Sequence, residues 1–232
     1  MGYYSEMPAR PLKLAAVIQA LKKHFGAPQP LPTRDPFELI LWENVAYLAP
    51  PARRRAAFEL LRRQVGLRPG DILAASQAAL ERVTAHGILK ARFADKLRGC
   101  AQIAIEDFGA DLGSVIRQPL PQAKKALRRF PGIGEPGADK ILLFAGVQNS
   151  LAPDSNALRV LVRLGFIAEH KSYARMYASS RELNAAPALK IAAVKEANLL
   201  LQTHGQTLCK RNAPLCGACP LANRCRFVLY SR

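Results

Sequence analysis

The sequence predicts an all-α protein, and three observations support this. Apolar residues recur at helical spacing in successive segments, with charged residues on the opposite face. Glycine and proline gather between these segments, where helices begin and end. No segment shows the strict apolar–polar alternation of a half-buried strand. The 232 residues suffice for one large domain or two small ones with a buried core.

The chain opens with an amphipathic helix and a proline-rich linker. The helix is predicted over residues 12–25 from its apolar face, and Gly26 ends it. The linker 27–36 leads into a second helix, predicted over 36–49. Asp35 is its candidate cap, and a proline occupies its first helical position, where the missing N–H costs little.

Further helices follow at short intervals. Residues 52–66 form a basic amphipathic helix rich in arginine. Turn residues at 68–70 and at 86–87 separate the next helical patterns from one another. These helices are expected over residues 71–80, 90–108, 155–164 and 188–204.

The charge balance is strongly basic. Lysine and arginine number 34 and aspartate and glutamate 17, so the formal net charge is +17. A polyanion is the natural partner, because basic side chains that neutralise phosphates release condensed counterions. The balance favours nucleic acid, and it leaves open RNA, an acidic membrane or a merely solvated basic surface.

Two features bear on where the protein works. No apolar run reaches the roughly 18 residues that a membrane helix needs. Residues 1–10 lack the charged-then-apolar order of a signal peptide. We therefore expect a cytoplasmic protein with no membrane partner.

A glycine-rich segment at 130–138 reads Phe-Pro-Gly-Ile-Gly-Glu-Pro-Gly-Ala, between a basic helix and an apolar one. Two glycines around one apolar residue permit a tight turn between helices. They also leave backbone N–H groups bare at the start of the second helix, which suits a DNA phosphate. The simpler alternative is an ordinary corner between helices. The residues expected to contact DNA here are Gly132, Ile133, Gly134 and Gly137.

Four of the five cysteines fall within a short C-terminal segment, whereas Cys100 stands alone as an expected core residue. Four thiolates this close are typical of a metal centre, and an odd count argues against a disulfide framework. A four-cysteine zinc site and a four-iron cluster use the same ligands, and spacing alone does not separate them. The expected ligands are Cys209, Cys216, Cys219 and Cys225.

Asp154 comes just before the apolar helical run 155–164. A helix cap is the simpler interpretation of a carboxylate at this position. The functional interpretation is a carboxylate at the mouth of a cleft.

Taken together, the glycine-rich turn between helices at 130–138 (the hairpin), Asp154 and the four clustered cysteines resemble the endonuclease III family of DNA glycosylases, within the helix-hairpin-helix superfamily. The resemblance runs from about residue 36 to residue 226, with the three motifs in the family's order. The spacing of six, two and five residues between the cysteines matches the family's [4Fe-4S] cluster loop. A His204-Gly205 pair ahead of Cys209 is also common there.

The resemblance implies a six-helix barrel-like domain with the hairpin at 34–147. A second helical domain would comprise residues 1–33 and 148–232 and carry the cluster. Double-stranded DNA that contains a lesion would bind in the cleft between them, and the damaged base would be flipped out of the stack. The protein would act as a monomer, associated with the nucleoid if bacterial. Two loop residues would hold the DNA backbone: Lys210 and Arg211.

The resemblance also implies a catalytic role for Asp154. It implies that Pro136 stands where other members carry a nucleophilic lysine. The aspartate would stabilise the cationic sugar or help to activate the nucleophile. Bifunctional members carry a lysine where Pro136 stands, and its amine forms a Schiff base with the sugar. Proline has no amine, so we expect a monofunctional glycosylase that uses water. Lys140, one helical turn further on, is the alternative nucleophile.

A second acid and a wedge are expected on the helix 36–49. Glu43 aligns with the catalytic glutamate of the adenine-removing branch, where the acid protonates the departing base. The alternative for Glu43 is an exposed helix glutamate or one that pairs with an arginine. Tyr47-Leu48-Ala49 replaces the family's usual gap-filling segment and offers an apolar wedge. The residues expected at the base pocket or wedge are Trp42, Tyr47, Leu48 and Pro136.

Other classes remain open at this stage. The scaffold would also suit a binder of damaged or structured DNA that breaks no bond, or a glycosylase with lyase activity from another lysine. A zinc or redox protein that never meets DNA is more remote. The sequence names neither the lesion nor the opposite base.

Overall fold

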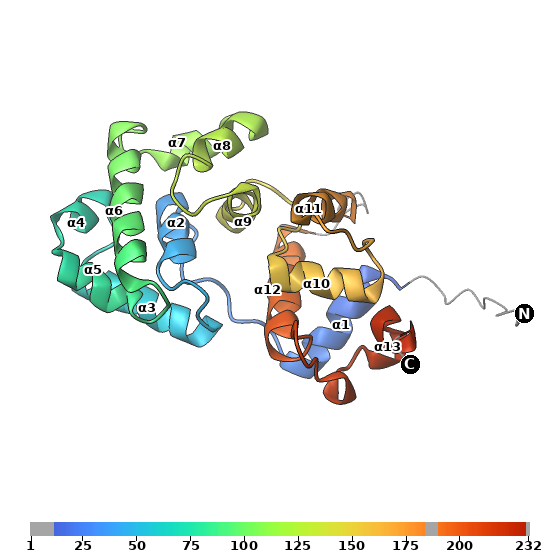
Figure 1. The fold of residues 1–232 in the computed structure, drawn as a ribbon. Coiled ribbons are helices and arrows are strands. Elements are labelled where there is room, and N and C mark those ends of the chain that lie inside the picture. Colours follow the sequence, from blue (N-terminus) through green and yellow to red (C-terminus); the bar gives the residue numbers. More distant parts are fainter. Residues whose placement is uncertain (1–11, 184–189, 231–232) are drawn as a thin grey trace, which may run out of the picture. The chain divides into compact units, whose positions relative to one another are not determined.

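The computed structural model of the protein describes residues 12–183 and 190–230. Every regular element in these ranges is helical, so the all-α prediction is confirmed (Figure 1). The chain divides into two compact units, residues 30–152 and residues 1–29 with 153–232. The expected domain boundaries, 34–147 and 1–33 with 148–232, differ from these by a few residues. None of the described helices combines the length and the apolar character needed to span a bilayer.

The unit of residues 30–152 is built around α2, which packs against α3, α6, α7 and α9. Nearly every side chain of α2 is buried, since the helix is apolar on all sides. Without the two shortest segments, α4 and α7, six helices remain in this unit. The helices are α2 (Pro36–Asn44), α3 (Pro51–Gln64), α4 (Pro69–Ala74), α5 (Gln77–Thr84), α6 (Lys90–Glu106), α7 (Leu112–Ile116), α8 (Leu120–Leu127) and α9 (Glu135–Ala145).

The other unit joins the two ends of the chain. The N-terminal helix α1 and helix α10 both pack against α12, and the Lys22 ammonium of α1 pairs with Glu196 of α12 at 2.8 Å (Figure 1). Two 3₁₀ turns, η2 (Cys216–Ala218) and η3 (Ala222–Arg224), follow α12. The helices are α1 (Leu14–Phe25), α10 (Ser155–Leu164), α11 (Tyr173–Glu182), α12 (Ile191–Thr207) and α13 (Arg226–Tyr230).

Three predicted helix boundaries are corrected. The helix expected over 36–49 ends at Asn44, because Leu48 adopts a left-handed conformation and the Tyr47 carbonyl bonds a distant loop. The helix expected over 71–80 is two helices, since Ala75 is extended and Ser76 caps α5. The expected turn at 68–70 is the start of α4. Residues 188–189 of the last predicted helix lie outside the described residues.

Candidate functional site

The glycine-rich segment forms the turn between α8 and α9, and so the predicted hairpin lies within one unit. Gly132 and Gly134 are exposed, whereas the Ile133 side chain is buried at 4% exposure. A Cβ on Gly137 would stand 3.4 Å from Cγ2 of Ile133, an ordinary van der Waals contact. The Ile133 N–H donates to the Phe130 carbonyl at 3.1 Å and so serves the turn. The exposed glycine backbone is therefore the part of this hairpin that a phosphate can approach.

The hairpin is held from α2 by Asn44, a residue that the sequence did not single out. Its side chain is buried at 1% exposure, and its amide donates to the Pro131 carbonyl at 3.0 Å and to the Ile40 carbonyl at 3.1 Å. Gly132 has a φ of 79°, and a Cβ there would collide with Oδ1 of Asn44. A buried ion pair between Lys124 and Asp139 also joins α8 to α9.

We expect Gly132→Ala to lower the free energy of unfolding more than Gly109→Ala does. Both glycines have positive φ, but nothing lies near a Cβ at Gly109, so that variant isolates backbone strain of about 1–2 kcal/mol. The collision with Asn44 should add about 1–3 kcal/mol at Gly132. Urea titration of both variants measures the difference. In an Asn44→Ala background the extra cost should disappear, and its persistence there would contradict the assigned contact.

Pro136 occupies the first turn of α9, and Lys140 lies one turn further along the same helix. The Lys140 side chain is 7% exposed, and its ammonium pairs with Oε1 of Glu43 on α2 at 2.8 Å. Glu43 thus has the ion-paired environment that was the alternative to a general acid, with a lysine as its partner. The pair also ties the hairpin helix to α2.

Two loops of this unit present apolar side chains to solvent side by side. Leu48 is 69% exposed, and Ile88 and Leu89 are 51% and 53% exposed. The Ile88 N–H donates to the Tyr47 carbonyl at 3.2 Å, and a Cβ on Gly87 would collide with the backbone of residues 46–47. The two loops therefore form one exposed apolar surface of Leu48, Ile88 and Leu89, which we call the apolar projection. Ile88 and Leu89 were not among the residues predicted for the wedge, although two adjacent apolar residues directly after the predicted turn at 86–87 are the signal for them.

Strain and packing set the shape of this projection. Leu48 and Leu89 both have a φ of 56°, the left-handed region that side chains rarely adopt. The Tyr47 ring stacks on Phe93 at 4.7 Å between centroids, so one of its faces is occupied. Trp42 is different: it is 5% exposed and packs edge-on against Phe58. Its burial places it in the core of the unit and leaves no open ring face for a base.

In the other unit, Asp154 caps α10, as the simpler interpretation predicted. Its Oδ1 accepts the backbone N–H groups of Asn156 and Ala157, each at 2.9 Å. Its Oδ2 accepts the Gln202 amide of α12 at 2.7 Å and faces the Asn156 amide at 3.4 Å. Burial, and then the charge of Asp154, raise the pKa of Tyr173 on α11 to about 12. Asp154 is therefore half-buried, fixed in orientation and surrounded by neutral donors.

Two arginines of α10 connect this carboxylate to the cysteine loop. Arg159 donates to Oδ1 of Asn156 at 2.9 Å and to the carbonyls of Gly205 and Cys209 at 2.7 and 2.8 Å. Arg163 donates to the carbonyls of Lys210 and Arg211 at 2.7 and 3.1 Å. These bonds use the backbone of residues 210–211 and leave both of their side chains exposed.

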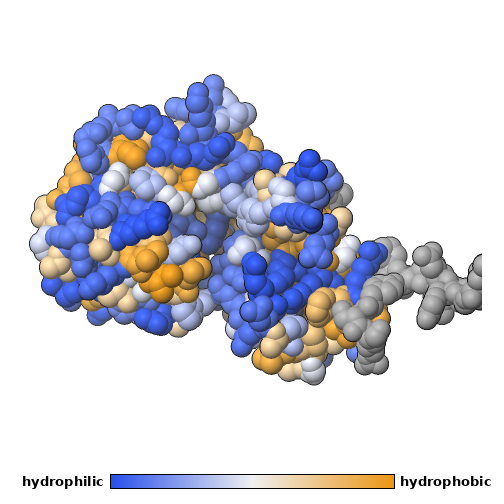
Figure 2. Space-filling view, viewed as in Figure 1, coloured by the Kyte–Doolittle hydropathy of each residue, from blue (hydrophilic) through white to orange (hydrophobic). Residues whose placement is uncertain are grey.

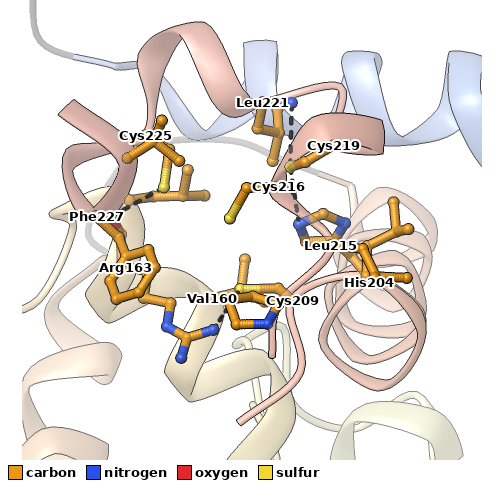
Figure 3. A pocket seen from close by; sticks show the side chains of 14 residues that line it. Val160, Arg163, His204, Cys209, Leu215, Cys216, Cys219, Leu221, Cys225 and Phe227 are labelled. Carbon is orange, nitrogen blue, oxygen red and sulfur yellow. Dashed lines mark hydrogen bonds between the residues drawn. The ribbon is translucent and has the colours of Figure 1, made fainter. Parts of the chain in front are cut away.

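The four expected cysteine ligands line one pocket, and Figure 3 shows their sulfur atoms around a shared space. The pocket has about 360 Å³ of empty space, part of it open to solvent. Cys209 Sγ accepts a guanidinium N–H of Arg163 at 3.3 Å, and Cys219 Sγ accepts the Leu221 N–H at 3.4 Å. Burial raises the pKa of Cys219, and that of Cys225 as well. His204 Nε2 lies 3.7 Å from Cys219 Sγ, and burial, with the nearby His24, lowers its pKa to about 4.

The donor set of this pocket consists of four thiols. All four thiols are free of disulfides, and no group of three or more His, Cys, Asp or Glu side chains in the described residues could hold a metal ion. A single zinc ion needs its ligands at about 2.3 Å from one point. In a four-iron cluster each thiolate binds its own iron, so the sulfur atoms stand around a wider space. The pocket thus gathers four free thiols, the donor set that a [4Fe-4S] cluster requires.

The visible surface of the molecule is largely polar. Figure 2 shows hydrophilic residues over most of the visible face of each unit, interrupted by small apolar patches. Such a surface, on a chain with a net charge of +17, is typical of proteins that contact phosphates.

Comparison with known proteins gives one sequence relative and several similar folds. No protein-family model matches the chain. Endonuclease III of Sulfolobus acidocaldarius is 25% identical over 205 residues, which cover 85% of this chain and 84% of the relative.

The solved structures show the fold. A trapped covalent intermediate of endonuclease III with DNA has a TM-score of 0.73 at 20% identity, covering 95% of this chain and 99% of that one. A thermostable thymine-DNA glycosylase has a TM-score of 0.71 at 17% identity, covering 94% and 97%. The 3-methyladenine DNA glycosylase of H. pylori, bound to 1,N6-ethenoadenine, has a TM-score of 0.59 at 15% identity, covering 85% and 99%. In sequence and in fold, this chain is endonuclease III-like and resembles the helix-hairpin-helix DNA glycosylases.

Proposed function

We propose that this protein is a monofunctional DNA glycosylase of base excision repair. It would bind double-stranded DNA that contains a damaged or mismatched base and hydrolyse the N-glycosidic bond of that base. The observation that carries the proposal is Asp154, a half-buried carboxylate held at the start of α10. The sequence relative is named an endonuclease III, and the similar structures include DNA-bound glycosylases.

Asp154 would act on the sugar. As the glycosidic bond breaks, the base leaves with the bonding electrons and positive charge develops on the deoxyribose. A carboxylate preorganised beside that charge stabilises the transition state without having to reorganise. Water then adds to the anomeric carbon and loses a proton, which leaves an abasic site.

Two features of α9 support the absence of lyase chemistry. Pro136 has no amine to attack the sugar. The amine of Lys140 forms an ion pair with Glu43, and a protonated amine has no lone pair for a nucleophilic attack. The same pair leaves Glu43 committed to Lys140 in this structure, so we do not assign it the protonation of the departing base.

We expect base release without strand cleavage from at least one duplex in a panel of lesions. The panel should include uracil, hypoxanthine, 1,N6-ethenoadenine, 8-oxoguanine and mismatched thymine or adenine. Alkali after the reaction reveals abasic sites, and omitting it reveals any lyase step. Borohydride should trap no covalent adduct on abasic DNA. An adduct that is lost in Lys140→Ala would contradict the monofunctional proposal, and tight binding without product on any lesion would favour a non-catalytic binder.

The apolar projection of Leu48, Ile88 and Leu89 would serve as the wedge that opens the base stack. Apolar side chains inserted between base pairs offset part of the unstacking cost of a few kcal/mol. The Leu48 side chain is 69% exposed, so it does not pack in the core of the unit, and core packing does not account for its strained backbone. Strain retained at an exposed position is typical of functional loops.

We expect Leu48→Gly to preserve or raise stability and to reduce base release. Glycine accepts a φ of 56° without strain, so the free energy of unfolding should change by between zero and about +1 kcal/mol. Loss of the wedge should slow base release by about tenfold or more, since 1.4 kcal/mol of unstacking is a factor of ten. Ala110→Gly is the matched control, because Ala110 is exposed with a φ of 62° and lies outside the projection. Equal activity of the two variants would rule out the wedge role of Leu48.

We further propose that the cysteine pocket holds a [4Fe-4S] cluster on Cys209, Cys216, Cys219 and Cys225. The cluster would organise the segment 209–225, which has only two 3₁₀ turns of its own. It would thereby present the exposed side chains of Lys210 and Arg211 to the DNA backbone. The base-releasing step itself would use none of these residues.

A further inference from the structure

The Asp154 carboxylate makes one bond that helix capping does not require. A cap needs one side-chain oxygen to accept backbone N–H groups at the start of its helix. Oδ1 of Asp154 meets that need with two such bonds at 2.9 Å. Oδ2 takes no part in them, yet it accepts the Gln202 amide at 2.7 Å. Gln202 comes from α12, far along the chain, so this bond is a tertiary contact.

The other aspartate caps of the described chain show the difference. Asp35 accepts the Glu38 N–H at the start of α2, and Asp111 accepts the Ser114 N–H at the start of α7. In the described residues, the groups that interact with these two carboxylates come from positions close to them in sequence. The second oxygen of Asp154 is thus restrained beyond the requirement of its helix.

We propose that Gln202 is a positioning residue, which fixes the plane of the Asp154 carboxylate by holding Oδ2. This inference rests on the proposed function, in which Asp154 stabilises the cationic sugar. Without Gln202, only the longer bond from the Asn156 amide, at 3.4 Å, would hold Oδ2, and the carboxylate would be freer to pivot about Oδ1. The bond from α12 removes this freedom, and a fixed orientation is what electrostatic stabilisation of a transition state needs.

The chemistry of the donor fits this role. A lysine or arginine in place of Gln202 would bring a positive charge beside the carboxylate and oppose the developing positive charge of the sugar. An amide donates a hydrogen bond and carries no charge. Arg159 interacts electrostatically with Asp154, but its hydrogen bonds go to Oδ1 of Asn156 and to backbone carbonyls rather than to the carboxylate. Tyr173, whose phenol lies within electrostatic reach of Asp154, is also neutral.

The test compares Gln202→Leu and Gln202→Glu with wild type on whichever duplex of the lesion panel wild type processes. Gln202→Leu should slow single-turnover base release by about 10–100-fold, as a misplaced catalytic group does, with unchanged DNA affinity and thermal stability. Gln202→Glu should shift the pH profile. Its introduced carboxyl would face Asp154, and two close carboxyls share a proton at low pH and repel each other when both ionise. The rate of this variant should therefore fall more steeply than that of wild type as the pH rises.

Gln206→Leu is the matched control, because Gln206 lies one turn further along α12 and its Oε1 is buried without a recorded hydrogen bond. This variant should keep the wild-type rate. An active wild type with an unimpaired Gln202→Leu, or a Gln202→Leu that loses DNA affinity rather than rate, would overturn this inference and leave the proposed function standing. A wild type that releases no base from any duplex would overturn both.

Discussion

Asp154→Asn should slow base release by about 10²–10³-fold, the usual effect of removing one preorganised electrostatic partner, and should leave the fold intact. Asparagine caps a helix as well as aspartate does, so the two bonds from the start of α10 survive the substitution. Gln202 can turn its amide to accept a bond from the new side chain, because its oxygen and nitrogen ends are interchangeable in shape. What the variant loses is the negative charge.

Single-turnover base release and thermal unfolding together measure this prediction. Asp35→Asn is the matched control, since Asp35 also caps a helix and accepts the Glu38 N–H at 3.0 Å. Both variants should unfold near the wild-type temperature, and Asp35→Asn should keep the wild-type rate. A fully active Asp154→Asn would show that Asp154 is only a cap. A large drop in stability in the same variant would point to the same conclusion.

Cys216→Ala should lose iron, lower thermal stability and weaken DNA binding. The segment that carries the four cysteines has little regular structure, so a bound group contributes directly to its folding free energy. Without that group, the apolar pocket would remain as a partly empty space, which is destabilising. Lys210 and Arg211 would then lose their fixed position.

The loss should extend to the rate of base release. Arg159 donates both to the Cys209 carbonyl and to the Asn156 side chain, which faces Oδ2 of Asp154. A disordered loop therefore removes one support of the carboxylate.

Iron content, visible absorbance, thermal unfolding and DNA titration report on each part of this prediction. Cys100→Ala is the control, because Cys100 is fully buried in the other unit, and burial raises the pKa of its thiol to about 12. That variant should keep its iron. A Cys216→Ala protein with full iron content and full DNA affinity would count against the cluster assignment.

Much of the fold and part of the site could be predicted from the sequence, because their signals are local. The apolar periodicity of α1, α3 and α10 lies within one helix length, and so does the cap at Asp154. The cysteines lie close together in sequence, so one short loop is enough to bring them near one another. The lesion is not among these local features, since pocket shape depends on side chains from several helices.

The boundaries and the supports of the site required the tertiary structure. After α2 ends at Asn44, the Tyr47 carbonyl accepts the Ile88 N–H of a loop distant in sequence, and local periodicity carries no trace of this bond. The pairing of Glu43 with Lys140 joins two helices that are distant in sequence, and it engages the functional groups of both residues.

The sequence by itself determined the helical fold class, the endonuclease III-like order of motifs, the four thiolates and the missing amine at Pro136. Each of these depends only on residue type and short spacing. The tertiary structure alone decided that Asn44 braces the hairpin, that Ile88 and Leu89 extend the projection of Leu48, and that Gln202 holds Asp154. These contacts arise between elements whose spacing along the chain leaves no periodic signal, so only the folded chain reveals them.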